Sequence, residues 1–306
     1  MNKKLQKIAL TGATSMIGLA LIKQCIQNGI EVLAFVRPNS FKLNRLPDSN
    51  LITIVNCGLD ELTDFKPTET EMADVFYHFA WEHTDKSGRC DCDKQLKNVS
   101  HTLSAVRLAK RMSCKKFIGA GSQAEYGRTS NPLTGVTPVN PENAYGIAKY
   151  AAGKFAVQEC KKLNMENVWV RILSVYGAND NDNTLLKDFI VNCQKNNAMP
   201  LGPCTHIWDY LHEDDAGCAF LAIGNKGMDG KTYCLGSGMG KPLKEYLEKI
   251  KNIINPEYIP QYDSIPYNGN SLQYLCADIS DLTKDTGWEP MISFEEGIRK
   301  TINCQQ

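Results

Sequence analysis

A short buried strand that leads through a glycine turn into a helix constrains the fold of this chain more than any other feature. Residues 8–10 are an apolar run typical of a buried parallel strand, and Gly12 follows where the chain must turn. Apolar residues then recur at helical spacing from about Ser15 onward. Backbone N–H groups and the helix dipole favour a pyrophosphate at such a helix N-terminus. Gly18 is the second glycine of the turn, and the small Ser15 stands where a third is usual. At this point an ordinary strand-to-helix turn is the alternative.

The second predicted strand, residues 31–36, ends in a basic residue. The residue after such a strand lies beside the adenosine ribose of a bound dinucleotide. An acid there favours NAD through the 2′-hydroxyl, whereas an arginine accommodates a 2′-phosphate. Arg37 holds this position, with Ser40, Lys42 and Arg45 close behind. We therefore expect NADP(H), with NAD as the alternative cofactor and a solvated basic loop as the alternative interpretation.

A tyrosine and a lysine at helical spacing are the second chemical feature. Tyr145 and Lys149 share one face of a helix predicted through about residue 163, so we expect the ammonium to lower the phenol pKa from about 10 towards neutrality. A phenol with that pKa suits a general acid or base. Ser122 lies at the carboxyl end of the strand predicted at residues 116–120, where open α/β sheets place their chemistry, and its hydroxyl can hold a carbonyl oxygen. A chance Tyr–Lys pair is common, but it does not explain the order of phosphate turn, Arg37, Ser122 and Tyr145.

The remaining pattern predicts an α/β chain with a doubly wound parallel sheet. We expect a dinucleotide-binding domain from residues 1–177 plus about 209–237, and a smaller lobe from about 178–208 plus 238–306, with the substrate in the cleft between them. Further strands are predicted at residues 51–55 and 74–80, and helices at 95–112, 185–193 and 242–254. Residues 83–94 are predicted to be an exposed loop, 236–240 a loop, and 258–267 a loop or an edge strand. The polar loop at 179–183 is either a flexible connection or in direct contact with the substrate.

Composition excludes several classes of function. The net charge is zero, so the chain has no electrostatic footprint for nucleic acid or an anionic membrane. No apolar run approaches the roughly 20 residues of a membrane span, and the basic N-terminus lacks the apolar core of a signal peptide. The twelve cysteines are scattered, which favours free thiols in the cytoplasm. Cys90, Cys92 and His83 lack zinc-site spacing, so no metal is expected.

These residues resemble the extended short-chain dehydrogenase/reductase family, in its nucleotide-sugar epimerase, dehydratase and reductase branch, over nearly the whole chain. Residues 11–18 resemble the T-G-x-x-G-x-x-G turn, and Ser122 with Tyr145 and Lys149 matches the catalytic set. Two further stretches resemble R-x-x-N-x-Y-G, with Ser174 in place of Asn, and R-D-F-V-H-V-D-D-A, with Trp208 in place of Arg. These two departures leave the nucleotide of the substrate open.

The resemblance implies a Rossmann-type fold, a nucleotide-diphosphate sugar as substrate, a homodimer, and roles for particular residues. Catalysis falls to Ser122, Tyr145 and Lys149. Substrate contacts fall to Trp81, Ser122, Gln123, Ser174 and Trp208. Cofactor contacts fall to Gly12, Thr14, Ser15, Met16, Ile17, Gly18, Arg37, Ser40, Leu59, Phe79, Ala80, Trp81, Tyr145, Lys149, Ile172 and Val175.

The residues after Ser122 limit which of the family's reactions we expect this chain to catalyse. The family's 4,6-dehydratases carry an Asp-Glu pair there, whereas this chain has Gln123 and Ala124, neither of which can act as acid or base. Two reactions remain: reduction of a 4-keto-6-deoxy sugar by NADPH, and epimerisation at C4 with NAD. Arg37 favours the reductase. A chain of this fold that binds the cofactor but serves as a sensor or scaffold is a third alternative.

Overall fold

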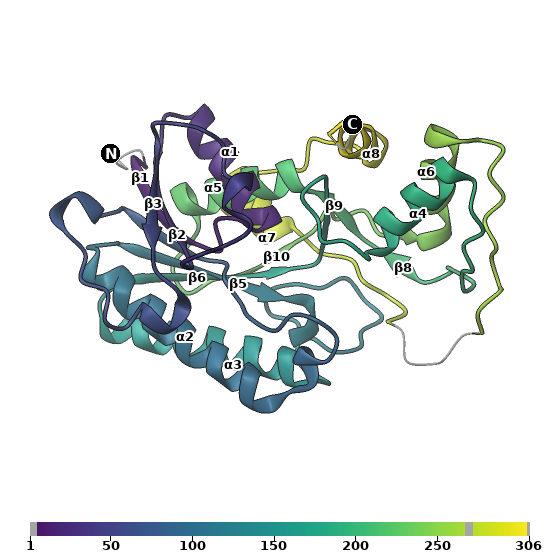
Figure 1. Cartoon of the computed structure of the whole chain (residues 1–306). Helices are drawn as coiled ribbons and strands as arrows, with labels where there is room; N and C mark the ends of the chain where they lie inside the picture. Colours follow the sequence, from purple (N-terminus) through teal and green to yellow (C-terminus); the bar gives the residue numbers. More distant parts are fainter. Residues whose placement is uncertain (1–4, 267–271, 305–306) are drawn as a thin grey trace.

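The computed structural model describes residues 5–266 and 272–304. Its centre is a seven-stranded sheet in the order β10-β6-β5-β4-β1-β2-β3, and every pairing in it is parallel (Figure 1). The order reverses between β1 and β4, which is where open α/β sheets bind ligands. The predicted doubly wound parallel sheet is therefore confirmed. Its strands are β1 (Lys7–Thr11), β2 (Glu31–Val36), β3 (Ile52–Asn56), β4 (Val75–His78), β5 (Lys116–Ser122), β6 (Glu166–Ile172) and β10 (Thr232–Leu235).

Helices cover both faces of the sheet because the strands are apolar on both sides. Two layers result, with α1, α5 and α7 on one face and α2 and α3 on the other (Figure 1). Leu10, Ile22 and Phe220 lie in the first core, and Phe76 and Phe117 lie in the second. The bounds are α1 (Met16–Gln27), α2 (Cys92–Arg111), α3 (Ala144–Lys162), α5 (Glu213–Lys226) and α7 (Ser280–Thr286).

A smaller lobe lies beyond the carboxyl ends of the central strands (Figure 1). Helices α4 (Leu185–Lys195), α6 (Leu243–Ile254) and α8 (Phe294–Asn303) share a separate core that includes Phe189 and Leu247. Two short ladders accompany it: β7 (Ser174–Tyr176) with β9 (Tyr210–His212), and β8 (Ile207–Trp208) with β11 (Lys241–Pro242). Leu282 and Trp288, from the range predicted for the lobe, pack in the core under α1 and α5. The domain boundaries stay a prediction.

Local capping explains where several elements begin and turn. Helix α2 begins at Cys92, three residues before the predicted start, because the Asp91 carboxylate accepts from the Lys94 N–H at 3.1 Å. The glycine-rich segment 236–240 is a loop, as predicted, and the buried Asp209 carboxylate accepts from the N–H groups of Ser237 and Gly238. The segment 258–267, predicted as a loop or an edge strand, has an isolated bridge from Gln261 to Pro200, and its last residue, Tyr267, lies outside the described residues.

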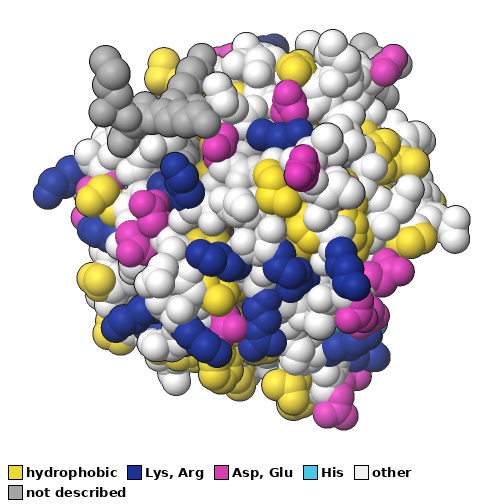
Figure 2. All heavy atoms as spheres, turned by 90° about the vertical axis from the view of Figure 1, so that its left-hand side faces the viewer, with side chains coloured by type: hydrophobic (Ala, Val, Ile, Leu, Met, Phe, Trp, Pro, Cys, Tyr) yellow, Lys and Arg dark blue, Asp and Glu magenta, His cyan; other side chains and the backbone are white. Residues whose placement is uncertain are grey.

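The surface carries charges of both signs, as the zero net charge of the sequence leads us to expect. Figure 2 shows the side that faces left in Figure 1, where lysines and arginines gather near the middle with acidic side chains among and around them. Among the helices that the structure describes, none is long and apolar enough to cross a membrane. The described residues also contain no cluster of three or more His, Cys, Asp or Glu that could hold a metal ion.

Candidate active site

The glycine turn after β1 packs tightly against the strand beside it. Gly12 has a φ of +75°, and a Cβ there would lie 2.7 Å from the Ala80 nitrogen, so only glycine fits. A Cβ on Gly18 would lie 2.3 Å from the Gly12 oxygen. Ser15 caps α1 by accepting from the Gly18 N–H at 3.1 Å, which leaves its hydroxyl hydrogen to donate to an anion. The turn and the N-terminus of α1 thus form a cradle that fits a dinucleotide pyrophosphate.

A first cavity runs from this turn along the ends of β2 and β3. Arg37, Ser40 and Lys42 line its rim, while Leu59 and Gly58 line it at the end of β3. The Arg37 side chain is exposed and lies over the Phe41 ring, 5.8 Å from its centroid. The cavity also contains Gly12, Thr14, Ser15, Phe79, Ala80 and Trp81, which completes much of the predicted cofactor set.

A second cavity adjoins the first and contains the predicted chemistry. The two share Ser15, Lys42, Phe79 and Trp81 among their lining residues, so they lie side by side. Predicted residues that line the second are Met16, Ile17, Ser122, Gln123, Tyr145, Lys149, Ile172 and Ser174.

Three predicted contact residues line neither cavity. Gly18 is buried behind the turn, and Val175 packs against the core under α1. Trp208 lies in β8, beside a cluster that includes Leu133, with its ring 5.5 Å from that of His206. Position in a motif therefore does not bring these three residues to the cavities.

The approach of α3 to the end of β5 brings Tyr145 to Ser122. Asn143 caps α3 by accepting from the Gly146 N–H at 2.8 Å. A Cβ on Gly146 would lie 2.3 Å from the Ala124 oxygen, so glycine lets the helix start against the turn after β5. The Ser122 and Tyr145 side chains line the same cavity, and Ser122 is among the groups that lower the pKa of Tyr145. A hydroxyl and a phenol thus meet in one cavity, which is the arrangement that can hold and protonate a carbonyl oxygen.

Lys149 is buried and held from two sides. Its ammonium donates to the Ala120 carbonyl at 2.7 Å and lies 3.7 Å from the centroid of the Trp81 ring. Burial lowers the pKa of Lys149 to about 7, with nearby Arg89 lowering it further and Glu125 opposing the shift. The lysine is therefore a poorer cation than an exposed one near neutral pH.

The predicted effect of Lys149 on Tyr145 is wrong. Burial raises the pKa of Tyr145, and the Ser122 hydrogen bond and the charge of Arg89 only partly oppose it. The Lys149 ammonium lies 5.8 Å from the centroid of the tyrosine ring, is committed to Ala120, and is itself driven towards its neutral form. Desolvation therefore wins, and the phenol keeps its proton at neutral pH.

A buried ion pair supports Ser122 from behind. Glu125, fully buried, accepts from the Ser122 N–H at 2.9 Å and from the Trp169 indole at 3.0 Å. Its other oxygen pairs with the Arg171 guanidinium at 2.7 Å. This carboxylate is the first acid after Ser122, and all its contacts are structural. Glu125 is therefore committed to Ser122, Trp169 and Arg171.

Several cavity residues were not predicted as ligands. Arg89 and Thr84 come from a loop predicted only to be exposed, and Arg45 from the basic loop after β2. Asn179, Asp180 and Asn181 come from the predicted polar loop, for which direct substrate contact and a flexible connection were both open. Proximity in sequence to Arg37 pointed to Arg45, but no local signal marked Arg89.

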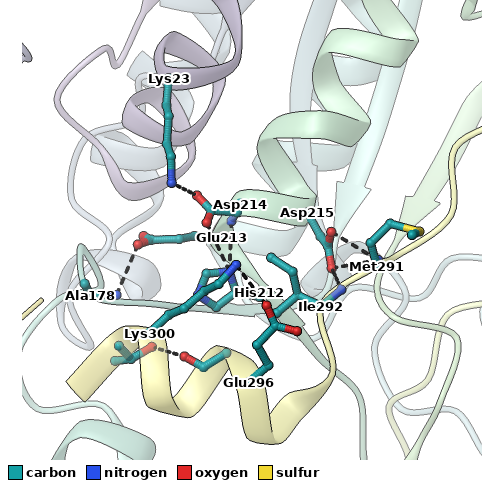
Figure 3. Close-up of polar contacts among 12 residues, drawn as sticks. Lys23, Ala178, His212, Glu213, Asp214, Asp215, Met291, Ile292, Glu296 and Lys300 are labelled. Atoms are coloured by element: carbon teal, nitrogen blue, oxygen red, sulfur yellow. Dashed lines mark hydrogen bonds and ion pairs between the residues drawn. The ribbon is translucent and has the colours of Figure 1, made fainter. Parts of the chain in front are cut away.

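The polar loop is anchored by a buried carboxylate at the start of α5. Glu213 accepts from the Ala178 N–H at 3.1 Å (Figure 3). It also accepts from both the backbone and the side chain of Asn179, each at 3.3 Å. Gly177 makes this possible, since a Cβ there would lie 2.3 Å from the Glu213 carboxyl carbon. Arg45 holds the same loop by donating to the Asn179 carbonyl at 2.6 Å. Arg45 also donates to the Thr14 carbonyl, so the loop is held beside the glycine turn at the edge of the cavity.

We expect Glu213→Gln to change how stability depends on pH. Burial raises the pKa of Glu213 to about 7, so the folded chain holds a proton that the unfolded chain has lost, and wild-type stability falls as pH rises from about 4.5 to 7. The variant has no carboxyl group at this position, so its stability should not fall in this way. Its unfolding free energy, from urea titrations, should gain on the wild type by on the order of 3 kcal/mol across that window. Glu289→Gln, at an exposed carboxyl, should track the wild type, and parallel curves for Glu213→Gln would contradict the prediction.

The sheet, the phosphate cradle and the Ser–Tyr–Lys cavity together match the extended short-chain dehydrogenase/reductase type. Residues 8–236 match the model of the NAD dependent epimerase/dehydratase family, and the chain belongs to that family. The predicted family is confirmed.

Relatives of this family carry out more than one reaction. The chain is 24% identical to the dTDP-4-dehydro-6-deoxyglucose reductase of Escherichia coli, over 99% of this chain and 98% of the relative. Its fold matches the UDP-glucose 4-epimerase of Thermotoga maritima, solved with UDP-glucose, with a TM-score of 0.87 at 21% identity and 98% coverage of each chain. RMD from Pseudomonas aeruginosa, solved with NADPH, matches with a TM-score of 0.82 at 19% identity and 98% coverage of each chain.

Proposed function

We propose that the chain reduces a 4-keto-6-deoxy nucleotide-diphosphate sugar to the 4-hydroxy sugar with NADPH. The observation that carries the proposal is the basic rim of the first cavity, where Arg37, Ser40 and Lys42 line the space beside the end of β2. A 2′-phosphate on the adenosine ribose fits such a rim. The full-length similarity to a dTDP-4-dehydro-6-deoxyglucose reductase supports the same reaction.

The side chains of the second cavity are suited to protonate the keto oxygen in this reaction. Bound NADPH supplies a hydride to the carbonyl carbon. Ser122 donates to the keto oxygen and orients it, and Tyr145 gives its phenolic proton to that oxygen as the alcohol forms. Because burial raises the pKa of Tyr145, the phenol carries the proton that reduction needs. Lys149, held by Ala120 and Trp81, lines the cavity beside the tyrosine.

An NAD-dependent 4-epimerase is the second candidate, favoured by the fold match to the Thermotoga maritima enzyme. Absorbance at the NADPH band separates the two reactions. With a dTDP-4-keto-6-deoxyhexose as substrate, we expect NADPH to be consumed one for one with the alcohol formed. A flat trace, together with interconversion of UDP-glucose and UDP-galactose without added cofactor, would establish the epimerase instead. Cofactor binding with no turnover of either substrate would indicate the sensor or scaffold.

We expect Arg37→Asp to reverse the cofactor preference. The wild type should bind NADPH more tightly than NADH, because the guanidinium pairs with the 2′-phosphate. The variant repels that phosphate and accepts from a 2′-hydroxyl, so NADH should bind more tightly to it. Dissociation constants from fluorescence titration of both cofactors give the result. Equal or tighter binding of NADH by the wild type would overturn the NADPH assignment, and Asp48→Asn, outside both cavities, serves as the control.

The homodimer also remains a proposal. Leu96 on α2, with Ile147 and Phe155 on α3, are each more than half exposed, and these two helices pack side by side. Apolar side chains at such exposure are suited to contact with a second copy.

A further inference from the structure

A cation that the proposed mechanism does not use lies against the catalytic tyrosine. The guanidinium of Arg89 is 4.7 Å from the centroid of the Tyr145 ring, and Arg89 lines the second cavity with it. Trp81 meets the same ring edge-on at 6.0 Å. Arg89 belongs to the loop before α2, far in sequence from Tyr145. The fold has therefore brought a full positive charge to the reacting end of the cavity.

The loop that carries Arg89 is held by buried amides of α2. Gln95, almost fully buried, donates to the carbonyl oxygens of His83 and Gly88, each at 2.9 Å, and accepts from the Trp81 indole at 2.9 Å. Asn98, equally buried, accepts from the Glu82 N–H at 2.9 Å and donates to the Glu82 carbonyl. A loop fixed at this many points presents Arg89 in one place, although the loop surface is exposed.

The turn itself fixes the direction of the arginine. Asp85 accepts from the Gly88 N–H at 3.0 Å, and a Cβ on Gly88 would lie 2.8 Å from atoms of both Asp85 and His83. The Arg89 Nε donates to the Thr84 carbonyl at 2.8 Å. That bond occupies one edge of the guanidinium. Within residues 5–266 and 272–304, no carboxylate forms an ion pair with Arg89, so its terminal amino groups remain for a ligand.

We propose that Arg89 binds the sugar unit of the substrate beside the reacting carbon. The inference rests on the proposed function in one respect, that Tyr145 faces that carbon. The terminal amino groups then donate to sugar oxygens next to the carbonyl, in the forked geometry that suits two neighbouring acceptors. The phosphates of the substrate are a less suitable ligand for Arg89, because other cations of the cavity can bind them. Lys42 and Arg45 line the cavity near the glycine turn, where Arg45 donates to the Thr14 carbonyl.

The charge of Arg89 also acts on the tyrosine. It is among the causes that oppose the rise in the pKa of Tyr145, after the Ser122 hydrogen bond. Loss of this charge should make the phenol a weaker acid. Arg89 thus contributes a sugar contact and, through the ring beneath it, a stronger proton donor.

Binding of matched ligands tests the inference without any reaction. Calorimetry compares UDP with UDP-glucose and dTDP with dTDP-glucose, in the presence of NADP⁺. For the pair that binds, the wild type should hold the nucleotide sugar more tightly than the nucleotide alone. Arg89→Gln should lose at least about tenfold in affinity for the nucleotide sugar and stay within about twofold for the nucleotide. Arg89→Lys should fall between, since it keeps the charge but loses the fork. Lys86→Gln, a cation of the same loop outside the cavity, should match the wild type.

Two results would overturn the inference: an unchanged sugar contribution in Arg89→Gln, or equal losses for nucleotide and nucleotide sugar. A wild type that gains no affinity from the hexose would overturn it as well. Failure of the proposed reduction shows instead as a flat NADPH trace while the sugar contribution to binding persists. Where turnover is observed, Arg89→Gln should also raise KM for the keto sugar and move the alkaline limb of the pH profile to higher pH. A purely structural role would instead lower the thermal midpoint and leave that limb in place.

Discussion

Tyr145→Phe is expected to lower kcat by about a hundredfold or more, because it removes the hydroxyl that protonates the forming alkoxide. The ring remains, so its edge-on contact with Trp81 and the position of Arg89 above it should persist. Affinity for the dinucleotide should therefore change little. Initial rates of NADPH consumption at saturating keto sugar give kcat, and fluorescence titration gives the affinity.

The matched control is Tyr150→Phe, which removes a hydroxyl from the same helix at a residue outside both cavities. It should keep wild-type turnover. Near-normal kcat in Tyr145→Phe would show that another group protonates the product, and Ser122 would be the next residue to replace. Loss of dinucleotide binding along with turnover would place Tyr145 in the architecture of the cavity instead of in proton transfer.

The sequence predicted the parts of this fold that depend on local pattern. Strand β1, the glycine turn and the start of α1 are contiguous, so residues 8–18 were enough to predict the cradle. Tyr145 and Lys149 are four apart on one helix, and Ser122 ends a strand, so their shared cavity follows once the sheet is parallel. The family resemblance added the residues just after β4 and at the end of β6 that line the cavities.

Features that depend on the environment of a side chain could not be predicted from the sequence. The predicted fall in the pKa of Tyr145 counted the distance along the helix to Lys149, but not the burial that decides its sign. Trp208 occupies a motif position yet packs beside Leu133, away from the cavities. Arg89 reaches Tyr145 from a loop that Gln95 and Asn98 hold in place through hydrogen bonds. Burial and long-range contacts of this kind do not follow from spacing.

The ion pair behind Ser122 is expected to be the largest single polar contribution to stability at this site. Glu125→Ala would leave the Arg171 guanidinium buried without its carboxylate, at a cost of about 3–5 kcal/mol in unfolding free energy. The Ser122 N–H and the Trp169 indole would lose their acceptor as well. Chemical denaturation followed by circular dichroism gives the loss in unfolding free energy.

Two further variants separate the buried charge from the shape of the site. Glu142→Ala breaks the exposed pair with Arg128 and should cost less than about 1 kcal/mol, because solvent screens such pairs. Combining Glu125→Ala with Arg171→Met removes the uncompensated charge, so the double variant should recover part of the lost stability. It should not recover kcat, because Ser122 still lacks the carboxylate that holds its backbone beside Tyr145. A loss below 1 kcal/mol in Glu125→Ala, or full turnover in the double variant, would show that Ser122 is positioned by β5 alone.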